Sequence, residues 1–176
     1  MTGALKRVDL WLMRRSVQTR SPRLNQTLVA LTHAANYSRL WLLIAGLLAA
    51  CAGRPGRRAA GRGILAVAIA AAVANGPAKL AARRRRPTAH SAPTLIRMPR
   101  STSFPSGHSA AAFAFATGAC GELPALLPLL GPLAGAVAYS RVHAGVHYPS
   151  DVAGGAAIGI GSGLLATRLA RGLDER

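Results

Sequence analysis

Acidic residues are scarce in this sequence of 176 residues, which has five of them against 22 lysines and arginines. Magnesium and calcium sites and two-metal catalytic centres need several oxygen ligands in one place. Outside the extreme C-terminus no two of the five acids lie close in the sequence, so we expect no paired-carboxylate metal site and no cofactor. The five are Asp9, Glu122, Asp151, Asp174 and Glu175.

Cysteines are scarce as well. Cys51 and Cys120 are the only two, and neither has a second cysteine or a histidine at the spacing of a zinc site. Both fall in apolar stretches, where cysteine packs as a small hydrophobic residue. We therefore predict two buried free thiols, which leave the redox compartment open.

Aromatic residues make up only 5% of the chain, and residues 1–23 contain no continuous apolar segment. Proteins that bind single-stranded nucleic acid stack the bases on exposed rings. The shortage of rings therefore counts against a nucleic-acid partner, despite a formal charge of +17. A cleavable signal peptide needs an uninterrupted apolar core, so none is predicted.

Long apolar stretches are what the chain does have. Hydrophobic residues form 51% of it, with 19 glycines, and small residues in such stretches suit helices that pack closely in lipid. A soluble helical domain would need polar faces that the last three stretches lack. We predict an all-α polytopic membrane helix bundle, residues 37–176, with about five transmembrane helices. The five stretches are 34–53, 63–82, 104–119, 123–139 and 152–170, and a basic turn at 54–62 separates the first two.

Residues 1–36 differ from the bundle because charged and apolar residues alternate there. Leu5, Val8 and Trp11 recur at helical spacing, with lysine and arginine elsewhere around the turn. This pattern is typical of an amphipathic helix in a membrane interface, and a helix packed on its own domain is the alternative. Ser21 and Pro22 predict the cap and first turn of a second short helix that ends near residue 36.

The twelve residues 140–151 join two apolar stretches and concentrate reactive side chains. Arg141 can bind an oxyanion through its planar fork of donors. His147 can attack an electrophile or move a proton, and Asp151, four residues later, can hold its ring in one tautomer. These three residues are the first candidates for an active site.

Two further motifs precede other apolar stretches. Lys79 and Arg86, the latter followed by proline, can neutralise an anion, as Arg141 can. Ser106, Gly107 and His108 follow Pro105 at the start of the third stretch. A glycine at a helix start lets the backbone approach an oxyanion, beside which the serine can donate its hydroxyl.

Together the three motifs resemble the signature of the type 2 phosphatidic acid phosphatase (PAP2) superfamily, a family of membrane lipid-phosphate phosphatases. The family pattern is K-x6-R-P, P-S-G-H and S-R-x5-H-x3-D, and residues 79–151 match every position. The resemblance implies that His147 attacks phosphorus to form a phosphohistidine without metal. It also implies that Asp151 orients and charges the ring and that His108 protonates the leaving alkoxide. The residues implied for phosphate binding are Lys79, Arg86, Ser106, Gly107 and Arg141.

The remaining histidines and the other arginines of the run 83–86 are predicted to have structural or surface roles. His33, His90 and His143 are most simply structural donors, and Arg83, Arg84 and Arg85 most simply a solvated run that meets anionic headgroups. Two other functions stay open: an enzyme resembling the vanadium haloperoxidases, which hold vanadate with similar residues, and a non-catalytic binder of anionic lipid or nucleic acid.

The resemblance implies a lipid-phosphate substrate, the membrane as partner and no nucleic acid, in an integral protein of a bacterial cell membrane. The candidates are polyprenyl diphosphate, phosphatidylglycerophosphate, phosphatidate and a phosphorylated polyprenyl sugar. With five spans the active-site face holds twelve lysines and arginines, leaving out the three catalytic ones, and the other face holds seven. The positive-inside rule then predicts a cytoplasmic active site, although many bacterial members of the family act on the outer face.

Overall fold

The computed structural model describes residues 3–88 and 93–174, and within them every regular element is a helix. The all-α prediction is therefore confirmed. Two short 3-10 helices, η1 (Asn36–Ser38) and η2 (Pro124–Leu126), precede the third and seventh α-helices. The α-helices are α1 (Gly3–Gln18), α2 (Pro22–Ala34), α3 (Arg39–Cys51), α4 (Gly53–Asn75), α5 (Pro77–Ala82), α6 (Gly107–Cys120), α7 (Leu127–His143) and α8 (Pro149–Asp174).

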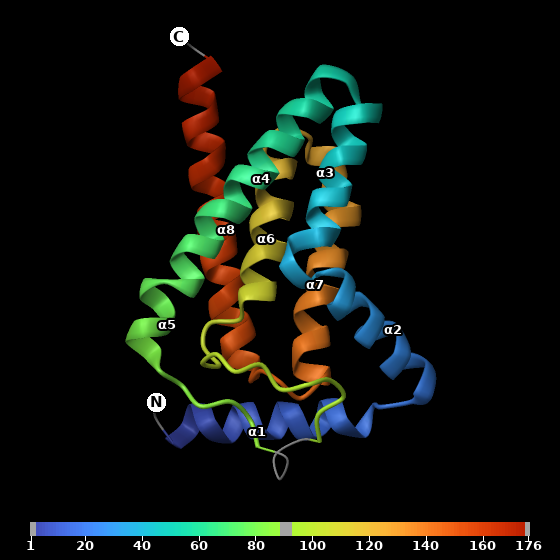
Figure 1. Ribbon diagram of the computed structural model, residues 1–176, viewed down its shortest axis with the longest axis vertical. Helices are drawn as coiled ribbons and strands as arrows, with labels where there is room; N and C mark the ends of the chain where they lie inside the picture. The colour runs from blue at the N-terminus through green and yellow to red at the C-terminus, as the bar shows by residue number, and fades with distance from the viewer. Residues whose placement is uncertain (1–2, 89–92, 175–176) are drawn as a thin grey trace.

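The helices form a bundle around α6 (Figure 1). Helices α4, α7 and α8 pack directly against α6, and α3 packs against α4. Helix α1 lies across one end of the bundle, and the connection from α5 to α6 runs along the same end. The C-terminus of α8 points away from that end. The polar motifs therefore all gather at the end of the bundle where α1 lies.

Glycines every fourth residue let α8 approach α6 closely. A Cβ atom added at Gly155 or Gly159 would collide with the backbone carbonyl of Ser106 or Ala110 on the α6 side. Such spacing of small residues is what close helix packing in lipid uses. It brings the first turn of α8 against the start of α6, where the Ser106 N–H donates to the Asp151 carbonyl over 3.0 Å.

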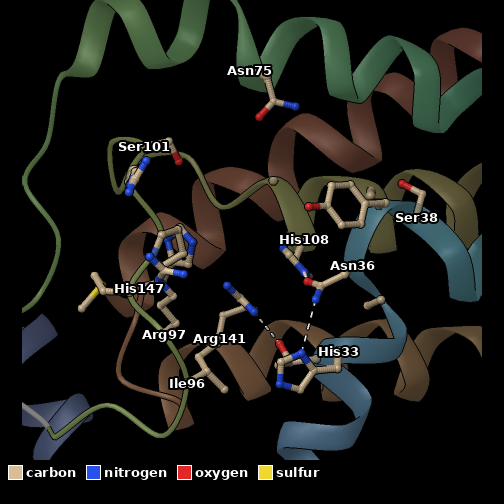
Figure 2. Close-up of a pocket in the computed structure, with 18 of the residues that line it drawn as sticks. His33, Asn36, Ser38, Asn75, Ile96, Arg97, Ser101, His108, Arg141 and His147 are labelled. Atoms are coloured by element: carbon tan, nitrogen blue, oxygen red, sulfur yellow. Dashed lines mark hydrogen bonds between the residues drawn. The ribbon is translucent and has the colours of Figure 1, made fainter.

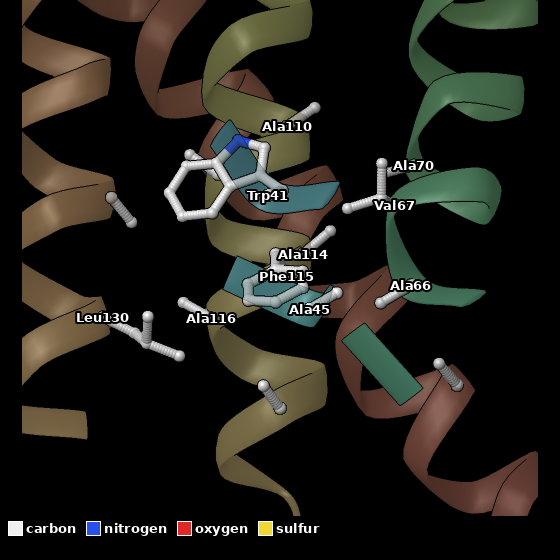
Figure 3. Close-up of a cluster of buried hydrophobic side chains, with 14 of the residues drawn as sticks. Trp41, Ala45, Ala66, Val67, Ala70, Ala110, Ala114, Phe115, Ala116 and Leu130 are labelled. Atoms are coloured by element: carbon white, nitrogen blue, oxygen red, sulfur yellow. The ribbon is translucent and has the colours of Figure 1, made fainter. Parts of the chain in front are cut away.

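Small side chains fill most of the core. Trp41 of α3 lies against Phe115 of α6, with ring centroids 5.5 Å apart, and alanines of α4 and α6 surround the pair (Figure 3). Large apolar side chains instead face outward, among them Leu43 and Leu47 of α3 and Leu129 of α7. Outward leucines over a core of alanine and glycine are expected where lipid, not water, is the surrounding medium.

Among the described residues, three stretches are long and apolar enough to cross a membrane: Gly53–Ala82, Pro124–His143 and Pro149–Gly172. A fourth is Pro22–Ala34 with Asn36–Cys51 if that pair, bent by 62°, counts as one span. All five predicted stretches are helical. Helix α6 has 14 residues, a length of about 21 Å, and the helices around it enclose it.

The predicted basic turn at residues 54–62 is wrong, because α4 begins at Gly53 and includes it. The reversal needs only the left-handed Gly53, at φ +58°. The arginines between residues 54 and 62 therefore belong to the first turns of α4. One of them, Arg62, pairs with Glu122 at 2.8 Å. The helix predicted for residues 63–82 also breaks at Gly76, where α5 starts with a proline.

Both cysteines are free, but the predicted burial fails for Cys51, which is exposed at the end of α3, while Cys120 is half-buried. The side of α3 that faces away from α4 is itself apolar and open. An apolar segment of a membrane protein therefore does not imply a buried thiol.

Both N-terminal helices form as predicted. Ser21 caps α2 by accepting from the Leu24 N–H over 3.3 Å, and Pro22 opens the helix. On α1, Asp9 and Met13 are buried while Val8 and Trp11 are exposed, so the helix both packs on its own domain and presents an apolar face outward. The predicted domain boundary between residues 36 and 37 falls inside η1 and stays a prediction.

Candidate active site

A cavity of about 880 Å³ opens at the α1 end of the bundle. It lies between the α2–α3 bend, α5, the connection from α5 to α6, the start of α6 and the end of α7 (Figure 2). Among the described residues that line it, none is acidic. The predicted site residues that line it are Lys79, Arg86, Gly107, His108, Arg141 and His147.

His147 lies between α7 and α8 and is only 3% exposed. Its Nε2 is 3.0 Å from a terminal nitrogen of Arg86, and its Nδ1 is 3.6 Å from Oδ2 of Asp151. Because a guanidinium can only donate, Nε2 is the acceptor, and the ring proton then sits on Nδ1, towards Asp151.

The charge state of His147 follows from its surroundings. Burial lowers its pKa to about 4, aided by Arg86 and Arg141, and Asp151 opposes this only in part. The imidazole is therefore neutral at neutral pH. A neutral ring whose Nε2 carries an electron pair, in a cavity that Lys79, Arg86 and Arg141 also line, has the properties of a nucleophile for an anionic electrophile.

Asp151 is fully buried behind His147, in the first turn of α8. Its Oδ2 accepts from the Ser103 hydroxyl and, at 2.9 Å, from the Tyr148 N–H, and its Oδ1 accepts from Arg84 at 2.6 Å. These donors fix the carboxylate in one orientation. The described residues contain no cluster of three histidine, cysteine or acidic side chains that could hold a metal ion.

Arg86 is fixed by the connection from α5 to α6 and by the loop before His147. Its Nε donates to the Ser101 carbonyl at 2.8 Å, and its terminal nitrogens donate to the Val146 carbonyl at 2.8 Å and to the Ser101 hydroxyl at 3.1 Å. Lys79 reaches the same hydroxyl at 3.4 Å and Asn75 at 3.0 Å. Ser101 thus lies between two of the predicted phosphate-binding cations.

Arg141 approaches the cavity from α7 and is held by α2. It is 3% exposed, and one terminal nitrogen donates to the Thr32 hydroxyl over 2.6 Å. Thr32 is fully buried and also accepts from Ser140 at 3.1 Å. Helix α2 therefore positions one of the three predicted phosphate-binding cations.

His108 is the second residue of α6, and its Nε2 lies 2.9 Å from Oδ1 of Asn36 (Figure 2). Because an amide oxygen only accepts, this nitrogen carries a proton and His108 is a donor at the cavity wall. The amide nitrogen of Asn36 lies 3.4 Å from Nδ1 of His33, which also lines the cavity.

Ser106 and Gly107 occupy different places. Ser106 is fully buried outside the cavity lining, and its hydroxyl caps α6 by accepting from the Ser109 N–H at 3.4 Å. Gly107 does line the cavity. A Cβ there would meet Oδ1 of Asn75 at an ordinary 3.5 Å, so packing within the protein alone does not require a glycine at this position.

The structure also corrects the reading of Arg84 as part of a solvated run. Its side chain is 13% exposed and pairs with both Asp9 and Asp151, whereas Arg83 and Arg85 are exposed as predicted. No signal within a run of four arginines distinguishes Arg84 from its neighbours. His143 is fully buried, with Nε2 2.8 Å from Asn25, in the structural role predicted, and His90 lies outside the described residues.

Comparison with known proteins agrees with this geometry. The family model described as the PAP2 superfamily matches residues 60–174. The PAP2-type phosphatidylglycerolphosphate phosphatase from Bacillus subtilis is 28% identical, with a TM-score of 0.73 over 99% of this chain and 88% of that one. Aquifex aeolicus LpxE is 26% identical, with a TM-score of 0.74 over 90% of this chain and 94% of that one. No match is found among curated proteins.

The match covers more than half of the chain and includes all three motifs, from Lys79 to Asp151. The protein has apolar helices long enough to span a membrane and is similar to a transmembrane phosphatase, so it is an integral membrane protein. The chain therefore belongs to the PAP2 superfamily and is a phosphatase of the PAP2 type.

Proposed function

We propose that this protein hydrolyses a lipid phosphate by transferring the phosphoryl group to Nε2 of His147, without a metal ion. The observation that carries the proposal is the neutral, buried His147, whose Nε2 lies against Arg86 in a cavity that Lys79 and Arg141 also line. The bound phosphate would take the place of Nε2 as the acceptor of Arg86. Three cations can neutralise the two negative charges of the phosphate and stabilise the negative charge of the transition state.

In the first step Nε2 attacks phosphorus while the bond from phosphorus to the alkoxide oxygen breaks. The leaving oxygen takes the electron pair of that bond and a proton from His108, which enters the step as the imidazolium, a form that the bound anion favours over the neutral ring. Asp151, beside Nδ1, stabilises the positive charge that develops on the ring of His147. Ser106 does not contact the substrate in this mechanism. It caps α6 and donates its N–H to the Asp151 carbonyl, and so holds α6 and the first turn of α8 together.

In the second step water attacks the phosphohistidine and gives a proton to His108. The bond between nitrogen and phosphorus breaks, its electron pair returns to Nε2, and inorganic phosphate leaves. Both residues regain their starting protonation, so the cycle balances without a metal or a second substrate.

The surroundings of the cavity support a lipid substrate. Tyr37 lines the cavity and is 86% exposed, and Leu80, next to Lys79 on α5, is 70% exposed. An acyl or prenyl tail could lie along such side chains while the headgroup enters the cavity. The candidates remain polyprenyl diphosphate, phosphatidylglycerophosphate, phosphatidate and a phosphorylated polyprenyl sugar.

Phosphate release from these four lipids, with purified protein in detergent and EDTA present throughout, tests the proposal. We expect at least one to be hydrolysed in EDTA and inorganic phosphate and vanadate to inhibit competitively. Activity lost in EDTA and restored by magnesium would contradict the metal-free mechanism. Binding without hydrolysis of any of the four would favour the non-catalytic alternative, and halide oxidation with vanadate and peroxide the haloperoxidase-like one.

We also propose that the protein lies in a bacterial cell membrane with its active site facing the cytoplasm. The charge imbalance between the two ends supports this orientation. Thr94, exposed on the connection from α5 to α6, can be replaced by cysteine after Cys51 and Cys120 are changed to serine. An impermeant thiol reagent on intact cells should then fail to label the protein before lysis, and labelling before lysis would place the site outside.

A further inference from the structure

Asp9 is an acid that no motif requires, yet it is buried at the active-site end of the molecule. It lies on α1 and is 1% exposed. Its Oδ2 accepts from Arg84 at 2.6 Å and from the Ser150 hydroxyl at 2.6 Å, and its Oδ1 accepts from the Ser150 N–H at 2.9 Å. One carboxylate of α1 thus holds both a guanidinium and the first turn of α8.

Arg84 continues this chain of contacts to the proposed catalytic carboxylate. One terminal nitrogen pairs with Asp9 and the other donates to Oδ1 of Asp151, each at 2.6 Å. The guanidinium also lies over the ring of Tyr148, 4.1 Å from its centroid. It is therefore held on two edges and one face, and its charge is shared between two buried carboxylates.

We propose that Asp9 and Arg84 are positioning residues that set the orientation and the effective charge of Asp151, so that the docking of α1 controls the rate of phosphoryl transfer. The proposal rests on the proposed role of His147 and Asp151. Arg84 withdraws negative charge from Asp151, and Asp9 compensates Arg84, which leaves Asp151 free to stabilise a positive ring on His147.

Opposite effects of the two charges follow from this arrangement. Asp9→Asn leaves Arg84 uncompensated and should make a positive His147 less favourable, so its pKa falls. Arg84→Gln leaves two carboxylates without their shared cation, so the pKa of His147 rises. Each shift should be about half a unit or more, and the double variant should return near the wild-type value because both charges are gone.

Other groups also act on His147 and stay unchanged in these variants. Asp151 of α8, Arg86 of the connection from α5 to α6, Arg141 of α7 and His108 of α6 face its ring. Asp151 is itself faced by Arg84 and His147, with the Ser103 hydroxyl and the Tyr148 N–H donating to it.

The test is an NMR titration of ring-labelled histidine in the detergent-purified protein, with the His147 signal assigned through His147→Gln. It needs no substrate, so it remains informative even if no lipid is hydrolysed, an outcome that would count against the proposed function alone. Shifts in opposite directions, cancelled in the double variant, support the inference. Shifts in the same direction, or none, overturn it.

Kinetics on whichever of the four lipids the wild type hydrolyses fastest gives the second readout. Asp9→Asn should lower kcat about tenfold with KM changed less than about twofold. Glu122→Gln breaks a similar acid–arginine pair at the other end of the bundle, and Arg85→Gln removes an exposed charge next to Arg84. Both controls should keep the wild-type kcat, and an Asp9→Asn enzyme with wild-type kcat would overturn the inference.

If Asp9→Asn or Arg84→Gln alone does not fold, the double variant tests the inference. Removing both charges avoids an unpaired buried ion, so Asp9→Asn with Arg84→Gln should still elute as folded protein. It should retain the wild-type pKa of His147 while its kcat falls. If the folded double variant keeps the full kcat, the two residues do not position Asp151.

Discussion

The two ends of the bundle use buried arginines differently. At the end away from the cavity, Arg62 meets Glu122 at 2.8 Å, with side chains 7% and 16% exposed, so one acid balances one base. At the cavity end, Arg84 meets two acids, while Lys79, Arg86 and Arg141 line a cavity whose described lining includes no acid. The first arrangement is complete without a ligand. The second leaves an excess of positive charge that a phosphate would neutralise, which distinguishes a binding site from a structural ion pair.

His147→Ala should have the largest effect at the cavity end, because it removes the proposed nucleophile. We expect no detectable turnover of a lipid phosphate, while the protein still elutes as a folded species in detergent. Steady-state phosphate release measures this. Residual turnover within a factor of about ten of the wild type would mean that another group attacks phosphorus.

Asp151→Asn should have the next largest effect. Asparagine can occupy the same space and hold the ring, but it cannot stabilise a positive charge on it, so kcat should fall about a thousandfold. The inhibition constant of inorganic phosphate should change little, because the three cations remain. Normal kcat with weakened phosphate inhibition would assign Asp151 to substrate binding instead.

Thr32→Val should have a smaller effect, confined to binding. The variant has nearly the same shape but loses the hydroxyl that accepts from Arg141, so KM and the inhibition constant for phosphate should rise about tenfold. Thr27→Val, on the exposed side of α2, is the matched control and should change neither. Equal effects of the two substitutions would remove Thr32 from the site.

Glu122→Gln should change neither kcat nor KM, in contrast to the substitutions of His147, Asp151 and Thr32 at the cavity end. The substitution leaves the buried Arg62 without its carboxylate partner and should lower the free energy of unfolding by about 2 kcal/mol. Thermal unfolding in detergent, kcat and KM, measured on the same preparation, check both statements. A lower kcat with unchanged stability would contradict the separation of the two ends.

The sequence was informative where residues carry a motif or a long apolar pattern. Helical segments and the Ser21 cap followed from spacing, and Lys79, Arg86 and Arg141 followed from the motifs shared with the PAP2 family. Arg97 and Arg100, which also line the cavity, were not predicted. What it could not predict depends on contacts between distant segments: Thr32 and Asn36 reach the site from helices that read as a separate interfacial region. Arg84 resembles its exposed neighbours in sequence and differs only because two buried acids meet it in space.

In the proposed mechanism phosphate is transferred to His147 before water attacks it. Rapid quenching with alkali during turnover of a phosphate-labelled lipid tests this order of steps directly, because phosphohistidine survives alkali but not acid. We expect an alkali-stable, acid-labile adduct that maps by mass spectrometry to His147 and is absent from His147→Ala. An active enzyme that never carries labelled phosphate on His147 would contradict this mechanism.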